Sequence, residues 1–130
     1  MHLMVSGEEG VKNVVSASDP FYCGVDVGAS ATKLVLLNNK KDIIAKVVKP
    51  SGVDYVATAA ECLAQAVREA GVHADPAKTF STGYGRHNVK FAEDSRTEIH
   101  CHGMGCYFYF PHSITIIDIG GQDNKVIRLD

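Results

Sequence analysis

Short β-forming segments separated by polar turns dominate the chain from about residue 20 to residue 50. Tyr22–Leu37 places strand-forming residues on both sides of a turn of small residues at Gly28–Thr32. Asn38–Lys41 has the polar composition of a hairpin turn, and Asp42–Lys49 gives a further strand that Pro50 ends. This order predicts a three-stranded antiparallel meander.

An amphipathic helix is predicted between Val53 and Ala70. Apolar residues recur there at steps of three and four, and polar residues fill the opposite stripe. Ser51 followed by Asp54 resembles a capping box, and Gly71 supplies a C-terminal stop. The apolar stripe indicates that one face of this helix packs against the sheet.

The rest of the chain is expected to alternate short strands with one more helix. The helix, rich in small residues, is predicted at Thr97–Tyr109. The strands are predicted at Lys78–Ser81, His87–Ala92, Ser113–Ile119 and Lys125–Leu129, the last two joined by a turn at Gly120–Asn124.

The most informative pattern is an internal repeat at a constant offset of 92 residues. Residues 117–129 (IDIGGQDNKVIRL) match residues 25–37 (VDVGASATKLVLL) without a gap. Asp26 aligns with Asp118, and Lys33 aligns with Lys125. Two copies of strand, Asp, glycine-containing turn, Lys and strand predict two similar lobes, each opened by the same hairpin.

These residue types suit a polyphosphate accompanied by Mg²⁺. A carboxylate at the end of a strand can hold Mg²⁺ through its waters, because this small ion dehydrates reluctantly. A glycine turn brings backbone N–H groups close to phosphate oxygens, and Ser30 and Thr32 add hydroxyl donors. An ordinary tight turn is the alternative for one hairpin alone, whereas two facing hairpins favour a phosphate clamp.

With these motifs the chain resembles the ATP-dependent activators of 2-hydroxyacyl-CoA dehydratases and the related ATP-binding subunits of benzoyl-CoA reductase. The stretches that carry the resemblance are Gly24–Lys33, Thr82–Arg86, Thr97–Gly105 and Ile117–Val126. The last is the most specific, because its Asp-Ile-Gly-Gly-Gln-Asp sequence is unlike the second phosphate motif of sugar kinases or actin.

The resemblance implies an α/β fold of the actin/hexokinase-like (RNase H-like) kind. The first ATPase lobe is expected at 22–112, with a three-stranded antiparallel meander plus parallel strands and helices. Residues 113–130 would be the opening hairpin of a truncated second lobe, and residues 1–21 a flexible extension. The resemblance further implies a homodimer with one [4Fe–4S] cluster between its subunits. ATP hydrolysis would drive a low-potential electron into a partner dehydratase or reductase.

By position, the resemblance makes Asp26 and Asp118 catalytic carboxylates on the Mg²⁺ side. Residues that would cradle the ATP phosphates are Gly28, Ala29, Ser30, Ala31, Thr32, Lys33, Gly120, Gly121, Gln122 and Asp123. Tyr84, Arg86 and Glu98 lie on segments expected to line the cleft. The family's cluster cysteines and adenosine-binding glycine motif lie further along than residue 130. We therefore expect no [4Fe–4S] cluster and little or no ATPase activity on this chain alone.

Composition narrows the partners and the compartment. A formal charge of −2 over 130 residues argues against a nucleic-acid or anionic-membrane surface. No apolar run approaches the ~20 residues of a membrane span, and the acidic start does not resemble a secretory signal, so the cytosol is expected. The four cysteines form no CxxC pair and are expected to be reduced thiols.

Three other interpretations stay open from the sequence. His100, Cys101, His102 and Cys106 could suggest a metal site, but we interpret this helix as a small-residue packing surface. An amino-sugar kinase of the same superfamily would use a cleft carboxylate as base, for which Glu98 is the nearest candidate. A non-catalytic lobe that binds phosphate weakly is the third.

Overall fold

In the computed structural model, residues 19–120 and 123–130 are described. Most of the expected N-terminal extension, together with Gly121 and Gln122, lies outside the described residues. The first strand begins at Phe21, one residue before its predicted start at Tyr22, and Phe21 is buried.

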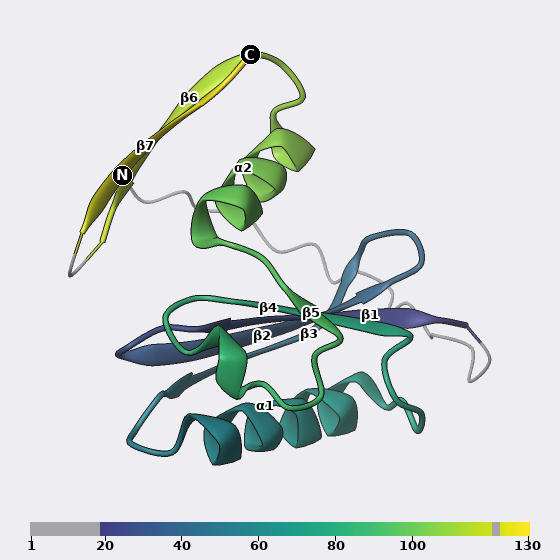
Figure 1. Cartoon of the computed structure of the whole chain (residues 1–130). Coiled ribbons are helices and arrows are strands. Elements are labelled where there is room, and N and C mark those ends of the chain that lie inside the picture. The colour runs from purple at the N-terminus through teal and green to yellow at the C-terminus, as the bar shows by residue number, and fades with distance from the viewer. Residues whose placement is uncertain (1–18, 121–122) are drawn as a thin grey trace, which may run out of the picture.

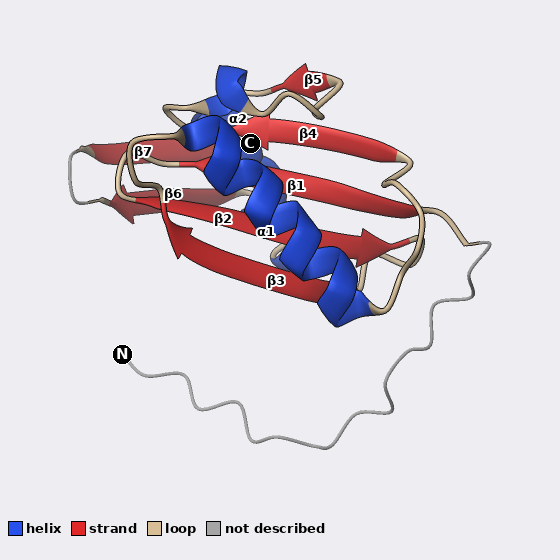
Figure 2. Ribbon diagram, turned by 90° about the horizontal axis from the view of Figure 1, so that it is seen from below, coloured by secondary structure: helices blue, strands red, loops and turns tan. Residues whose placement is uncertain are grey.

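A five-stranded sheet in the order β3-β2-β1-β4-β5 forms the centre of the molecule (Figures 1 and 2). β1 (Phe21–Val27), β2 (Ala31–Asn38) and β3 (Ile43–Pro50) are antiparallel, so the predicted meander is confirmed. β4 (Lys78–Thr82) and the two-residue β5 (Asp94–Ser95) extend the sheet in parallel with β1.

The helix α1 (Tyr55–Ala70) crosses one face of this sheet, as its apolar stripe predicts (Figure 2). Its C-terminal end at Gly71, with φ of +67°, is also confirmed. The predicted start at Val53 and the capping box around Ser51 are wrong. Asp54 caps the helix, because its carboxylate accepts a hydrogen bond from the Ala57 amide at 2.9 Å.

The predicted strand His87–Ala92 is wrong. A 3₁₀ turn (Arg86–Asn88) stands there instead. Ser81 Oγ donates to the Arg86 carbonyl at 2.9 Å, and Asn88 donates its side-chain amide to the Gly85 carbonyl at 3.2 Å. These bonds fold the segment back onto the end of β4, so it cannot extend as a strand.

The second helix and a separate hairpin lie on the side of the sheet opposite to α1 (Figure 1). The helix α2 (Glu98–Tyr109) is capped by Thr97, whose hydroxyl accepts from the His100 amide at 3.3 Å. β6 (Ile114–Ile119) and β7 (Asn124–Leu129) pair as an antiparallel two-stranded sheet, and α2 packs on β7. None of the helices in the described part of the chain has the length and apolarity needed to cross a bilayer.

Corresponding faces of the two repeated hairpins are covered differently. Val25, Val27 and Leu34 are at most 2% exposed, because they form the core beneath α1. Their counterparts in the second hairpin, Ile117, Ile119 and Val126, are 69–79% exposed. The repeat therefore reproduces the hairpin without its helical cover among the described residues.

Candidate functional site

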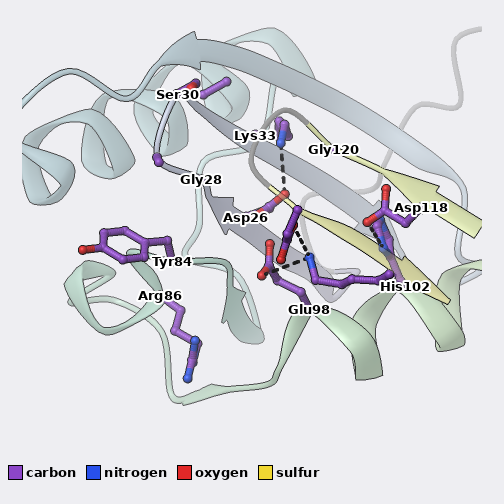
Figure 3. A pocket seen from close by; sticks show the side chains of 14 residues that line it. Asp26, Gly28, Ser30, Lys33, Tyr84, Arg86, Glu98, His102, Asp118 and Gly120 are labelled. Atoms are coloured by element: carbon purple, nitrogen blue, oxygen red, sulfur yellow. Dashed lines mark hydrogen bonds and ion pairs between the residues drawn. The ribbon is translucent and has the colours of Figure 1, made fainter. Parts of the chain in front are cut away.

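A cavity of about 690 Å³ lies between the two repeated hairpins, at the point where β1 and β6 end (Figure 3). Its other walls come from the loop after β4 and from the start of α2. The lining residues are Asp26, Gly28, Ala29, Ser30, Ala31, Lys33, Tyr84, Arg86, Glu98, His102, Asp118, Gly120, Asp123 and Lys125.

The glycine turns of the two hairpins share one backbone arrangement. The Gly28 amide donates to the Ala31 carbonyl at 3.0 Å, and the Gly120 amide donates to the Asp123 carbonyl at 2.9 Å. A Cβ added at either glycine would stand 2.9 Å from that same carbonyl oxygen, closer than real side chains come. Each turn therefore needs glycine at its first position, and the sequence repeat is also a repeat in three dimensions.

The two carboxylate oxygens of Asp26, at the end of β1, differ in their contacts. Its Oδ2 lies 3.2 Å from the ammonium of Lys33, its cross-strand neighbour on β2. Its Oδ1 is buried and has no hydrogen-bond partner among the described residues. A buried carboxylate oxygen without a donor costs free energy unless a cation or water reaches it.

In the second hairpin, the carboxylate of Asp118 contacts a histidine of α2. Asp118 Oδ2 lies 3.2 Å from His102 Nδ1 on α2. Lys125, the cross-strand neighbour of Asp118, lies 3.1 Å from Asp123 and 3.7 Å from Glu98. The hydrogen bond to Asp123, with the nearby carboxylates of Glu98 and Asp118, raises the pKa of Lys125. The lysine is thus a fixed positive charge at neutral pH.

The structure brings most of the sequence-predicted site residues to this cavity, with one exception among those described. Thr32 is fully buried, and its hydroxyl is 2.9 Å from Ser51 Oγ instead of facing the cavity. Tyr84, Arg86 and Glu98 line the wall as expected, although Arg86 also donates to the carbonyl of Gly83 at 3.2 Å. Gly121 and Gln122 lie outside the described residues.

Sequence reasoning missed His102 and Lys125 as site residues. Lys125 carried a usable signal, because the repeat aligns it with Lys33. His102 was interpreted as part of a packing surface, yet it is half-exposed and points to Asp118. The signal for it was its spacing of four residues from Glu98, which places both on one face of α2. Over residues 19–120 and 123–130, no group of three or more His, Cys, Asp or Glu side chains is arranged to hold a metal ion.

Comparisons with known proteins agree with this geometry. The chain is 44% identical over 108 residues to the activator of lactoyl-CoA dehydratase from Anaerotignum propionicum, covering 82% of this chain and 41% of that protein. Among solved structures, component A of the (R)-2-hydroxyglutaryl-CoA dehydratase of Acidaminococcus fermentans matches 85% of this chain and 43% of its own, with a TM-score of 0.77 and 36% identity. The ADPNP-bound activator of the 2-hydroxyisocaproyl-CoA dehydratase from Clostridium difficile matches 85% of this chain and 41% of its own, with a TM-score of 0.75 and 39% identity.

This chain therefore has the expected actin/hexokinase-like α/β fold, and it spans about two fifths of the length of these relatives. The sequence pattern of the BadF/BadG/BcrA/BcrD ATPase family matches residues 23–130, nearly the whole of the described part. The chain belongs to the BadF/BadG/BcrA/BcrD ATPase family.

Proposed function

We propose that this chain is the ATP- and Mg²⁺-binding N-terminal part of an activator of a 2-hydroxyacyl-CoA dehydratase or a benzoyl-CoA reductase. The observation that carries the proposal is the pair of matching hairpins whose glycine turns, carboxylates and lysines meet at one cavity. The relatives named as dehydratase activators support this choice over an amino-sugar kinase, and the ADPNP bound to one of them supports ATP as the ligand.

The phosphates would be held by the exposed turn Ala29–Ala31 and by Lys33 on one side, and by Gly120 and Asp123 on the other. Two lysines supply fixed charge for a polyanion, and the glycine turns admit close approach of the ligand to the backbone. Positioned donors and cations of this kind stabilise charge that develops on a transferred phosphoryl group.

The residues at the cavity fit Mg²⁺ as a companion of the nucleotide. Mg²⁺ is commonly bound by one or two carboxylates plus phosphate oxygens and water, rather than by a complete protein cage. Asp26, whose buried Oδ1 has no hydrogen-bond partner among the described residues, and Asp118 are the carboxylates that would hold it. When bound, the ion supplies charge neutralisation and Lewis acidity at the phosphates.

We further propose the remaining properties from the family resemblance set out in the sequence analysis. The whole protein would act in the cytosol as a homodimer and couple ATP hydrolysis to electron transfer into its dehydratase or reductase. The described residues offer no cysteine cluster that fits a [4Fe–4S] centre, since Cys23 and Cys62 are buried in the core of the first lobe. We therefore assign no step of cluster chemistry to residues 22–112 or to the hairpin at 113–130.

Amide chemical shifts during titration with Mg-ATP and pyrophosphate test the proposal. We expect shifts concentrated at residues 28–33 and 120–125, and Asp26→Ala should reduce the Mg²⁺-dependent part. Asp75→Ala is the matched control, because Asp75 is an exposed carboxylate remote in sequence from both hairpins. Shifts spread evenly over the surface, or equal in both variants, would contradict the assignment.

A further inference from the structure

We propose that α2 is the positioning element of the second hairpin: His102 orients Asp118, and Glu98 joins Asp123 in holding Lys125 apart from that carboxylate. The contacts that carry this inference are independent of the ligand's identity. Its effect on Mg²⁺ and phosphate rests on the proposed function.

The two hairpins begin from the same arrangement but pair their charges differently. Asp26 and Lys33 are cross-strand neighbours and form an ion pair with each other at 3.2 Å. Asp118 and Lys125 are cross-strand neighbours as well, yet the ion pairs of Lys125 with described residues go to Glu98 and Asp123. Part of this difference lies in the hairpin itself, because Asp123 stands where the first hairpin has Ala31 and accepts from Lys125 at 3.1 Å. The contact that holds Asp118 comes from outside the hairpin.

That outside contact is one face of α2. Glu98 and His102 are four residues apart in the helix and therefore project from the same side. One reaches Lys125 at 3.7 Å, and the other reaches Asp118 at 3.2 Å (Figure 3). Two successive turns of one helix thus contact both members of the cross-strand pair.

Close packing of α2 on β7 sets the separation between the helix and the second hairpin. Gly103, next to His102, is buried, and a Cβ there would stand 3.4 Å from Leu129 Cδ2 of β7. The side chains of Lys125 and Asp118 are 19% and 27% exposed, against 52% and 34% for Lys33 and Asp26. Asp118 and Lys125 are therefore more sheltered from water and salt than Asp26 and Lys33, while their partners on α2, His102 and Glu98, are 50% and 44% exposed.

The consequence is a difference in what the two carboxylates offer a ligand. With its Oδ2 held by His102, Asp118 keeps one orientation, and Lys125 stays beside the cavity in contact with Asp123 and Glu98. Without His102, Asp118 is free to pair with Lys125, as Asp26 pairs with Lys33. His102 is thus a positioning residue, since it acts through Asp118.

The state of the His102 ring tests the contact without any ligand. We measure ring nitrogen shifts by long-range ¹H–¹⁵N correlation at about pH 8, where an unperturbed imidazole of pKa about 6.5 is neutral. His102 should carry its proton on Nδ1, and Asp118→Asn should abolish that preference. His100, two residues earlier and lining a different groove, is the control. A His102 ring protonated on Nε2, like a free histidine, would overturn the inference.

Binding of Mg-pyrophosphate by calorimetry tests the effect. His102→Leu should weaken Mg²⁺-dependent binding about 10-fold or more, the usual loss when a partner of a metal-side ligand is removed. His102→Asn, which returns an N–H donor close to the position of Nδ1, should recover most of it, and His100→Leu should change nothing. If His102→Asn fails as badly as His102→Leu, the positioning role is wrong. If the unaltered chain binds no Mg-pyrophosphate, the proposed function fails, while the ring-nitrogen result still decides the contact.

Discussion

At Gly83 the loop after β4 comes so close to β1 that it leaves no room for a side chain. Its φ is +91°, and a Cβ there would overlap Asp26 Oδ1 and stand 2.5 Å from the Val27 carbonyl oxygen. We expect Gly83→Ala to cost about 2–4 kcal/mol of unfolding free energy, from strain plus overlap.

Gly52→Ala is the matched control for this substitution, measured by urea denaturation. Gly52 also has a positive φ, +61°, but an added Cβ would meet nothing within 4 Å. Only the backbone term should remain there, about 1 kcal/mol. Equal losses in the two variants would show that the loop moves away from Asp26 without cost.

The four cysteines should fall into two reactivity classes. Burial raises the pKa of Cys23 to about 12 and also raises the pKa of Cys62, whereas Cys101 and Cys106 are half-buried. With a disulfide reagent at pH 8, we expect two thiols to react in the folded protein and the other two only after denaturation. Rapid reaction of all four would contradict the packing of α1 on the sheet.

The same shift predicts a pH effect on stability. The fold favours the neutral Cys23 thiol, so the stabilising contribution is complete below the ordinary pKa of 9.0. It is lost as pH rises from 9.0 toward about 12. Cys23→Ala should flatten this loss in alkaline unfolding curves, and an unchanged pH dependence would contradict the assignment.

On the scale of elements, Ser51 connects the Gly28 turn to α1. Its hydroxyl donates to the Gly28 carbonyl at 2.6 Å and contacts Thr32 Oγ1 at 2.9 Å, and its carbonyl accepts from Thr58 Oγ1 at 2.9 Å. Ser51→Ala should cost about 1–3 kcal/mol, because Thr32 is left buried with one partner fewer. It should also broaden the amide signals of the Gly28 turn.

The capping variant Asp54→Ala separates these two effects. It removes one N-cap bond and should cost about 1 kcal/mol without any change at Gly28. If both variants disturb the turn equally, the connection runs through the helix as a whole and not through Ser51.

Hydrophobic periodicity along the chain predicts most of the helices and strands. The meander, α1, α2 and the second hairpin follow from alternation, helical spacing and the repeat. The segment 87–92 could not be predicted in this way, because its conformation depends on side-chain bonds of Ser81 and Asn88 to nearby carbonyls, which no hydrophobic pattern encodes. Ser51 resembled an N-cap for a different reason: its real partners, Gly28 and Thr32, are 23 and 19 residues away.

The residues of the candidate site could be predicted where they belong to the repeated hairpins. The repeat placed both glycine turns and both carboxylates, since these residues belong to the hairpins themselves. It could not place His102, because the contact with Asp118 joins two elements through tertiary packing. Thr32 was assigned to the cavity from its position in the turn, but the inward side of β2 buries it.

On the scale of the whole molecule, the outer face of the second hairpin is an exposed apolar surface. It is formed by Ile117, Ile119 and Val126, whose counterparts in the first hairpin are buried. Apolar area of this kind, on a sheet whose outer edges are unpaired among the described residues, favours association. We expect sedimentation at increasing concentration to show a dimer formed through this face.

Ile117→Asp should raise the dissociation constant of that dimer about tenfold or more, because burying one Ile side chain contributes about 1.5–3 kcal/mol. Val48→Asp is the control, since Val48 is an apolar residue, 67% exposed, on β3 and outside the second hairpin. A chain that stays monomeric at high concentration with β6 and β7 ordered would contradict this prediction.

The connection between the two sheets has a mechanical consequence. The backbone passes from β5 to β6 once, through α2. The segment that contains α2 is therefore the single covalent connection between the hairpin and the larger sheet. A polyphosphate gripped by both hairpins would add a second, removable link and close a ring. Pyrophosphate, long enough to span, should therefore slow amide hydrogen exchange across residues 114–129 more than orthophosphate at equal occupancy. The bound polyphosphate would then restrict the motion of the second hairpin relative to the larger sheet, and its hydrolysis would remove that restriction.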